Sequence, residues 1–226
     1  TNDLLSLLGD NLERETSNAV LSAYGRYLGA IAVYWPSFFD QHQSRLLPAP
    51  PDKQSAWEAV FATYVAYNSP HSDVAPRLLS HYERAVRSFS QLSPTSFLAR
   101  HADRIIGHLL GLALQPEPAP WDSLLDEALR AGPADAVAQT VHDLAFAIER
   151  EGLQVGNDWL LGLLHQQVQE LAQTRDSSAK VASAWYELVL SAQLPIGQAI
   201  GPLVALGAIG GATGERADDR CHAAAA

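Results

Sequence analysis

Apolar residues return at intervals of three and four along almost the whole chain, and strict alternation is hard to find. This spacing indicates amphipathic helices rather than strands. A first helical segment runs from about Asp3 to Tyr34 and is expected to end at Trp35-Pro36, because proline disfavours helix in the residue before it. An irregular stretch through Leu47-Pro48-Ala49-Pro50-Pro51 follows. It is the strongest internal boundary of the chain.

Beyond that boundary, one predicted helix follows another, and most are closed by a helix breaker. Apolar stripes predict helices within 57–65, 74–89, 97–112, 121–131, 137–148, 160–171 and 181–188, with a last helix reaching about Leu206. Ser93-Pro94 is expected to cap and begin the helix that contains Phe97. The glycines from Gly207 to Gly214 are interpreted as a flexible exit from the last helix.

Grouped in pairs, these helices begin near residues 54, 94, 133 and 177, so the spacings are roughly 40, 39 and 44 residues. Such periods are close to those of HEAT and armadillo repeats. We therefore expect an all-α fold of about four stacked helical hairpins, a HEAT-like α-solenoid, after a long N-terminal helix or helix pair. An irregular helical bundle is the alternative. The expected organisation is an N-terminal helical segment at 1–47, hairpin repeats at 52–208 and a flexible tail at 209–226.

Three segments carry a resemblance to a known group of proteins. They are the helix from Trp57 to Tyr64, LSHYERAVRSF at 79–89 and LARHADRIIGHLLGL at 98–112. The region 54–150 resembles the degenerate helical repeats near the C-terminal ends of large bacterial multidomain proteins, among them defence-type signalling ATPases. The resemblance implies a sensor or scaffold arm, with catalysis on domains absent from this chain.

Charge and cysteine content narrow the function classes. The net charge is −10, which argues against a nucleic-acid binder because phosphates must be met by clustered Lys and Arg. The single cysteine, Cys221, excludes a disulfide framework within one chain and fits a reducing, cytoplasmic compartment. The chain contains no methionine, so we expect it to be a piece of a longer protein.

The motif search predicts that the chain is not an enzyme and holds no cofactor. No phosphate-binding loop, dinucleotide fingerprint, nucleophile elbow or H-E-x-x-H zinc motif is present. His101 and His108 lie two helical turns apart, about 10.5 Å of rise, which is too far for both to ligate one ion. We therefore predict no metal site, and we interpret His81, His101 and His108 as boundary residues.

Arginines gather between residues 71 and 104. They are Arg77, Arg84, Arg87, Arg100 and Arg104, and with Asp73, Glu83 and Asp103 they give this stretch a net charge of +2 against −12 elsewhere. Because guanidinium groups bind carboxylates and phosphates bidentately, we predict that these five arginines bind an acidic protein partner or a phosphate-bearing ligand. The alternative is a solvated face with local ion pairs.

A second hypothesis is a small-molecule pocket, in a regulator or an unrecognised enzyme. Its predicted lining is aromatic: Trp57, Tyr64, Tyr67 and Tyr82. A separate feature is the run from Leu188 to Gly214, which is 27 residues long and uncharged. Prolines, glutamines and six glycines argue against a membrane span there. We expect a buried terminal helix, or a face covered by a continuing chain or a second copy.

Overall fold

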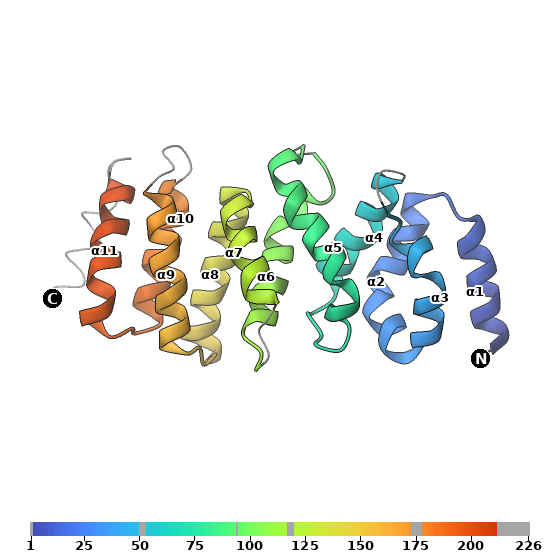
Figure 1. Ribbon diagram of the computed structural model, residues 1–226, viewed down its shortest axis with the longest axis horizontal. Coiled ribbons are helices and arrows are strands. Elements are labelled where there is room, and N and C mark those ends of the chain that lie inside the picture. Colours follow the sequence, from blue (N-terminus) through green and yellow to red (C-terminus); the bar gives the residue numbers. More distant parts are fainter. Residues whose placement is uncertain (1, 50–52, 94, 117–119, 173–177, 212–226) are drawn as a thin grey trace. The chain divides into compact units, whose positions relative to one another are not determined.

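The computed structural model describes residues 2–49, 53–93, 95–116, 120–172 and 178–211, and every regular element in those ranges is helical (Figure 1). The α-helices are α1 Asn2–Arg14, α2 Asn18–Tyr34, α3 Pro36–Leu46, α4 Gln54–Tyr67, α5 Ala75–Ser88, α6 Ala102–Ala113, α7 Trp121–Ala131, α8 Ala134–Glu151, α9 Asn157–Leu171, α10 Ser178–Ser191 and α11 Ile196–Gly211. Short 3-10 turns, η1 at Phe89–Gln91 and η2 at Ala99–His101, lie between α5 and α6. The prediction of an all-α fold is confirmed.

The chain forms two compact units, Thr1–Leu125 and Asp126–Ala226, and the boundary lies inside α7. Within the first unit α2 packs on α3 and α4, α1 packs on α3, and α4 contacts α6. Within the second unit α10 packs on α8, α9 and α11, and α9 also contacts α11. Alternate helices in the sequence are therefore neighbours in each unit.

The N-terminal region takes the helix-pair form of the prediction and departs from the prediction in one place. The segment from Asp3 to Tyr34 is a helix pair, because α1 ends before Glu15, whose carboxylate accepts the N–H groups of Thr16 and Ser17. The stretch after Trp35 is a further helix, α3, where the sequence predicted irregular structure. Pro36 occupies its first turn, where a missing N–H costs nothing. Proline therefore separates α2 from α3 without ending helical structure.

Two more boundaries were predicted wrongly. Helix α6 begins at Ala102, after η2, so Ser93 does not cap it and Phe97 lies outside it, exposed. The last helix continues past Leu206 to Gly211, so Gly207, Gly210 and Gly211 are helical; Gly214 and the tail from 212 lie outside the described residues. Continuing backbone hydrogen bonds outweigh the poor helix propensity of glycine there.

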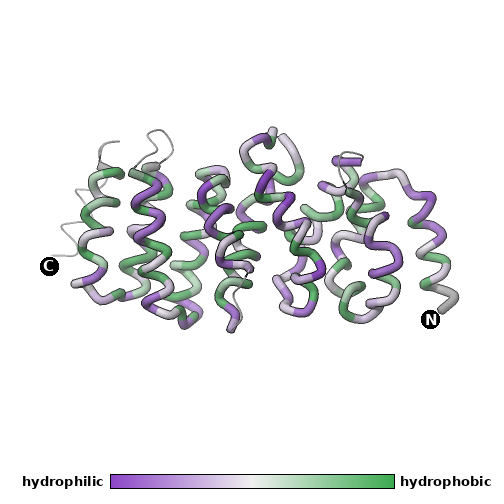
Figure 2. The backbone as a smooth tube through the Cα atoms, in the orientation of Figure 1, coloured by the Kyte–Doolittle hydropathy of each residue, from purple (hydrophilic) through white to green (hydrophobic). Residues whose placement is uncertain are grey.

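The uncharged C-terminal segment includes α11. Figure 2 shows this helix largely in green and pale shades, in keeping with its lack of charged residues. Ala199, Pro202 and Leu206 are buried, whereas Ile200 and Val204 are exposed. Among the described helices, none combines the length and the apolar character needed to cross a bilayer.

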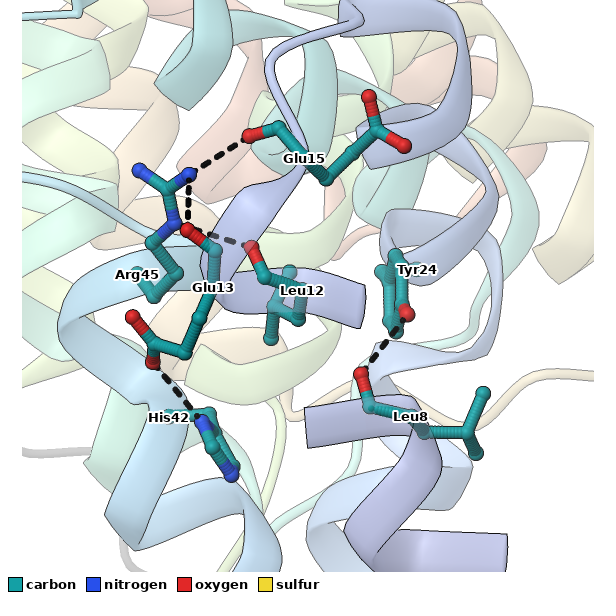
Figure 3. Close-up of polar contacts among 7 residues, drawn as sticks. All are labelled: Leu8, Leu12, Glu13, Glu15, Tyr24, His42 and Arg45. Carbon is teal, nitrogen blue, oxygen red and sulfur yellow. Dashed lines mark hydrogen bonds and ion pairs between the residues drawn. The ribbon is translucent and has the colours of Figure 1, made fainter. Parts of the chain in front are cut away.

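Arg45 of α3 holds the C-terminal end of α1 (Figure 3). Its Nε donates to the carbonyl of Leu12 at 3.0 Å, and one Nη donates to the carbonyls of Glu13 at 3.0 Å and Glu15 at 2.6 Å. The last carbonyls of a helix have no partner inside the helix. A guanidinium supplied by α3 therefore satisfies the end of α1 and complements its dipole.

Glycine allows α2 and α4 to cross at very short range. A Cβ atom added at Gly25 would lie 2.3 Å from the carbonyl oxygen of Val60, and one at Gly29 would lie 2.8 Å from Oδ1 of Asn68. Asn68 also donates from Nδ2 to the carbonyl of Arg26 at 3.2 Å. The crossing therefore fixes the C-terminal end of α4 against the middle of α2.

Replacing Gly25 by alanine should lower the free energy of unfolding by about 1–3 kcal/mol, because the added methyl group meets backbone that must move. The matched control is Gly107→Ala in α6, where a Cβ meets nothing within 4 Å. That variant should be stabilised by up to about 1 kcal/mol through helix propensity. Denaturant midpoints for both variants check the opposite signs, and equal shifts would contradict the close crossing.

Replacing Arg45 by alanine should loosen α1, because three carbonyls at its C-terminal end lose their donors. Amide hydrogen exchange measures this directly, and we expect faster exchange along α1 with unchanged exchange in α8 of the second unit. Arg87→Ala is the control, since the Arg87 guanidinium bonds only to Glu83 on its own helix in the described contacts. Unchanged α1 protection in Arg45→Ala would show that the cap contributes nothing.

Candidate functional site

Two of the predicted partner-binding arginines are engaged in holding the first unit together. Arg77 Nη1 lies 2.9 Å from Oδ1 of Asp40 in α3, and its guanidinium lies over the ring of Phe39. Arg84 donates to the carbonyl of Pro48 at 2.7 Å and to Gln54, and its Cζ lies 4.0 Å from the centre of the Trp57 ring. Arg84 is half-buried, which suits neither the predicted partner-binding role nor the alternative of a solvated face. Its stacking on a core tryptophan explains why.

The other three predicted arginines are exposed, and each has a local acceptor. Arg87 pairs with Glu83 one turn away at 2.9 Å, and Arg100 donates to the carbonyl of Thr95 at 3.2 Å. Arg104 lies 3.9 Å from the carboxylate of Asp103. The five arginines therefore do not form one free positive stripe, because each guanidinium already has a hydrogen bond or an ion pair with an acceptor of the same chain.

The four predicted pocket aromatics do not line one site. Trp57, Tyr64 and Tyr82 are buried, and each contacts the ring of Phe61: Trp57 stacks on it, and Tyr82 meets it edge-on. Tyr67 at the end of α4 lies apart, with 64% of its surface exposed. The first three rings form a packed core between α4 and α5. Large aromatic rings are stabilised by burial of their apolar surface, which favours this packing over an open pocket.

A buried histidine joins α4, α5 and α6 in this core. The Nε2 of His108 lies 2.7 Å from the carbonyl of Asn68, and its Nδ1 lies 2.8 Å from the hydroxyl of Tyr82. Because a carbonyl only accepts, Nε2 carries the proton, and Nδ1 accepts from the tyrosine hydroxyl. Burial lowers the pKa of His108 to about 4, so the ring is neutral.

His81 satisfies the indole of Trp57. Trp57 donates from Nε1 to Nδ1 of His81 at 3.2 Å. Burial, with the charge of Arg84 adding to it, lowers the pKa of His81 to about 4. A protonated imidazole would lose its acceptor nitrogen, so the neutral form is the one that holds the tryptophan.

One hydroxyl in the core is left without a hydrogen bond. The Tyr64 oxygen is buried and has no partner among the described residues, although Tyr82 is close enough to interact with it electrostatically. Burial raises the pKa of both tyrosines. The histidines and tyrosines of this cluster therefore act as neutral structural groups, closed off by packed rings.

An exposed apolar surface on α2 was not predicted. Apart from Asn18, the exposed residues of α2 are Ala19, Val20, Ala23, Arg26, Tyr27, Val33 and Tyr34. Trp35 and Tyr67 flank them. We call these nine residues the α2 surface. Tyr27 and Tyr34 are 59% and 73% exposed, and Tyr34 contacts Trp35 edge-on.

A sequence signal for this surface exists. Arg26 is the only charged residue in the 17 residues of α2, and Val20, Tyr27 and Tyr34 recur every seven positions, which places them on one helix face. From the sequence, this helix is expected only as part of a helical segment from about Asp3 to Tyr34. Periodicity along the chain does not show that α3 and α4 cover the opposite side.

Acidification should destabilise the folded chain through His81 and His108. Below the ordinary histidine pKa of 6.5 the unfolded chain binds protons that the folded chain excludes until about pH 4. The contribution of the two neutral histidines to the free energy of unfolding is therefore complete above pH 6.5, and it is lost as the pH falls toward 4. Between pH 7 and pH 5 the free energy of unfolding should fall by about 2 kcal/mol for each histidine.

Urea unfolding at several pH values measures this loss. His108→Gln should remove roughly half of the histidine contribution, whereas His71→Gln, which alters an exposed histidine, should leave the dependence as in the parent chain. Identical pH dependence in all three proteins would contradict the assignment of a buried neutral His108.

Among the described residues, no group of three or more His, Cys, Asp or Glu side chains is arranged to hold a metal ion. Comparison of the chain with protein-family models, with curated proteins and with solved structures finds no match. The exposed apolar residues of the α2 surface make it the candidate site.

Proposed function

We propose that this chain is a non-catalytic helical scaffold or sensor module that binds a protein partner in the cytoplasm, as part of a larger bacterial protein. The observation that carries the proposal is the α2 surface, where seven exposed helix residues include one charge. Exposed apolar patches rimmed by polar residues mark interaction sites. Tyr, Trp and Arg are also the residue types that dominate binding energy at interfaces.

The proposed architecture is a stack of HEAT-like helical hairpins. Packing of alternate helices supports it: α2 with α4 and α4 with α6 in the first unit, and α8 with α10 and α9 with α11 in the second. In stacked hairpins each helix meets the equivalent helix of the next hairpin, so such neighbours are expected. A stack of this kind presents helix faces, which suits binding to a protein.

The arginines of α5 and the η2–α6 region are a weaker proposal for the contact with an acidic partner. Arg77, Arg87, Arg100 and Arg104 are exposed, but each already has an acceptor that a partner would have to displace. Breaking the existing contact of such an arginine offsets part of the free energy that a new ion pair with the partner would contribute. The α2 surface has no such cost.

The double variant Tyr27→Ser/Tyr34→Ser should lose the proteins that the parent chain captures from a bacterial lysate. Phe146→Ser, which removes an exposed aromatic of the second unit, is the matched control and should capture the same proteins as the parent. For a purified captured protein, the double variant should weaken Kd at least about tenfold, because interface tyrosines are common hot spots.

Folding has to be unaffected for this result to count. Because both tyrosines are exposed, thermal unfolding of the double variant should match the parent within about 0.5 kcal/mol. Equal capture by the double variant and the parent would contradict binding at the α2 surface.

A further inference from the structure

Arg26 is the single charge on the α2 surface. Helices α2 and α4 together carry two charged residues, Arg26 and Glu58. Glu58 lies in the second turn of α4, whereas Tyr67, which contacts Arg26, lies at its end. On these two helices, the neighbours of the exposed guanidinium are therefore aromatic rings rather than carboxylates.

Two tyrosine rings hold the Arg26 side chain. Its Cζ lies 4.9 Å from the centre of the Tyr67 ring and 5.9 Å from that of Tyr27. The carbonyl of Arg26 accepts the Asn68 side chain, which fixes Tyr67 beside α2. Ring contacts of this kind use the faces of a guanidinium and leave the N–H groups on its edges available.

Those N–H groups have no acceptor in the part of the chain that the structure describes. Three other arginines of this unit differ in this respect: Arg45 bonds to three carbonyls, Arg77 to Asp40 and Arg84 to Pro48. The N–H groups of Arg26 are therefore satisfied by water until a partner covers the surface. A partner that buried this charge without an acceptor would incur a large desolvation penalty.

We propose that Arg26 binds a carboxylate on the partner of the proposed scaffold, from an Asp or Glu flanked by apolar residues on a helix. Apolar residues on both sides would pack on Tyr27, Tyr34 and Trp35, and the carboxylate would take the bidentate geometry that a guanidinium offers. This inference rests on the proposed function. It adds the chemistry by which the partner is recognised.

A carboxylate fits better than a phosphate group or a membrane. Phosphorylated segments are recognised by clusters of arginines, and anionic lipid surfaces attract clusters of basic residues. The α2 surface has one cation, on a chain with net charge −10. A single guanidinium among aromatic rings provides one bidentate contact and little long-range attraction.

A direct test uses 3-phenylpropanoate as the probe and its uncharged amide, 3-phenylpropanamide, as the control. In nitrogen-15 NMR spectra of the full chain, the Nε–H signal of Arg26, assigned by its loss in Arg26→Gln, should shift saturably with the carboxylate. The Arg87 signal should move little, because Arg87 is already paired with Glu83. Equal shifts with the amide, no saturable shift, or a larger shift with inorganic phosphate would overturn the carboxylate assignment.

A second experiment separates this inference from the proposed function. Helical peptides are selected on the parent chain by phage display, and one selected peptide is compared with its Glu→Gln or Asp→Asn form. We expect Arg26→Gln and the peptide substitution each to weaken binding about tenfold, with little further loss when both are combined.

The possible outcomes of these experiments distinguish the carboxylate proposal from the proposed scaffold function. If binding is lost in Tyr27→Ser/Tyr34→Ser but unchanged in Arg26→Gln, the scaffold surface stands and the carboxylate proposal fails. If no selected peptide depends on Tyr27 and Tyr34, the proposed function fails. Arg26-dependent binding to phosphatidylglycerol vesicles, without competition by the peptide, would replace the protein partner by a membrane and overturn both.

Discussion

The close crossing of α2 and α4 is the constraint on which the first unit depends. Gly25 lets the two backbones meet where even a methyl group would collide with the Val60 carbonyl. Helix α4, together with α3, packs on one side of α2, and the other side is exposed. The same crossing brings the end of α4 to Arg26, where Asn68 bonds to its carbonyl and Tyr67 lies beside its guanidinium. The apolar surface and its single charge are thus consequences of one backbone contact.

Polar groups inside the unit are used to hold helices rather than to perform chemistry. His108 is neutral and bridges α5 to the chain after α4, while His81 accepts the indole proton of Trp57. Each hydrogen bond offsets the cost of burying a polar group, and the lowered histidine pKa values follow from that burial. The Tyr64 hydroxyl is less well satisfied, because it is buried and interacts only with the side chain of Tyr82. The buried histidines and tyrosines, which are packed among aromatic rings, therefore belong to a structural core.

The arginines of the first unit differ in how far their guanidinium groups are already engaged. Arg45 caps α1, and Arg84 ties α5 to the chain before α4 while stacking on Trp57. Counting charge along the sequence treats these residues as equivalent to Arg26. Geometry distinguishes them, because a guanidinium that already donates to carbonyls has little left to offer. The proposed recognition site is therefore an apolar helix with one cation rather than the positive stretch of the sequence.

The sequence by itself determined that the described chain is helical, and it located most breaks, since three-to-four spacing and Pro or Gly punctuation act locally. It anticipated α4, α5 and α7 closely. The sequence pattern did not predict α3, because Pro36 follows the end of α2 and also begins α3. A proline in the sequence is compatible with either role, so the start of a new helix could not be told from the end of the previous one. Which side of each helix is covered was decided only by tertiary packing. Val20, Tyr27 and Tyr34 follow the same period as core residues, and they are exposed because α3 and α4 pack against the opposite side of α2. Local periodicity defines an apolar face, but only the neighbouring helices determine whether that face is buried.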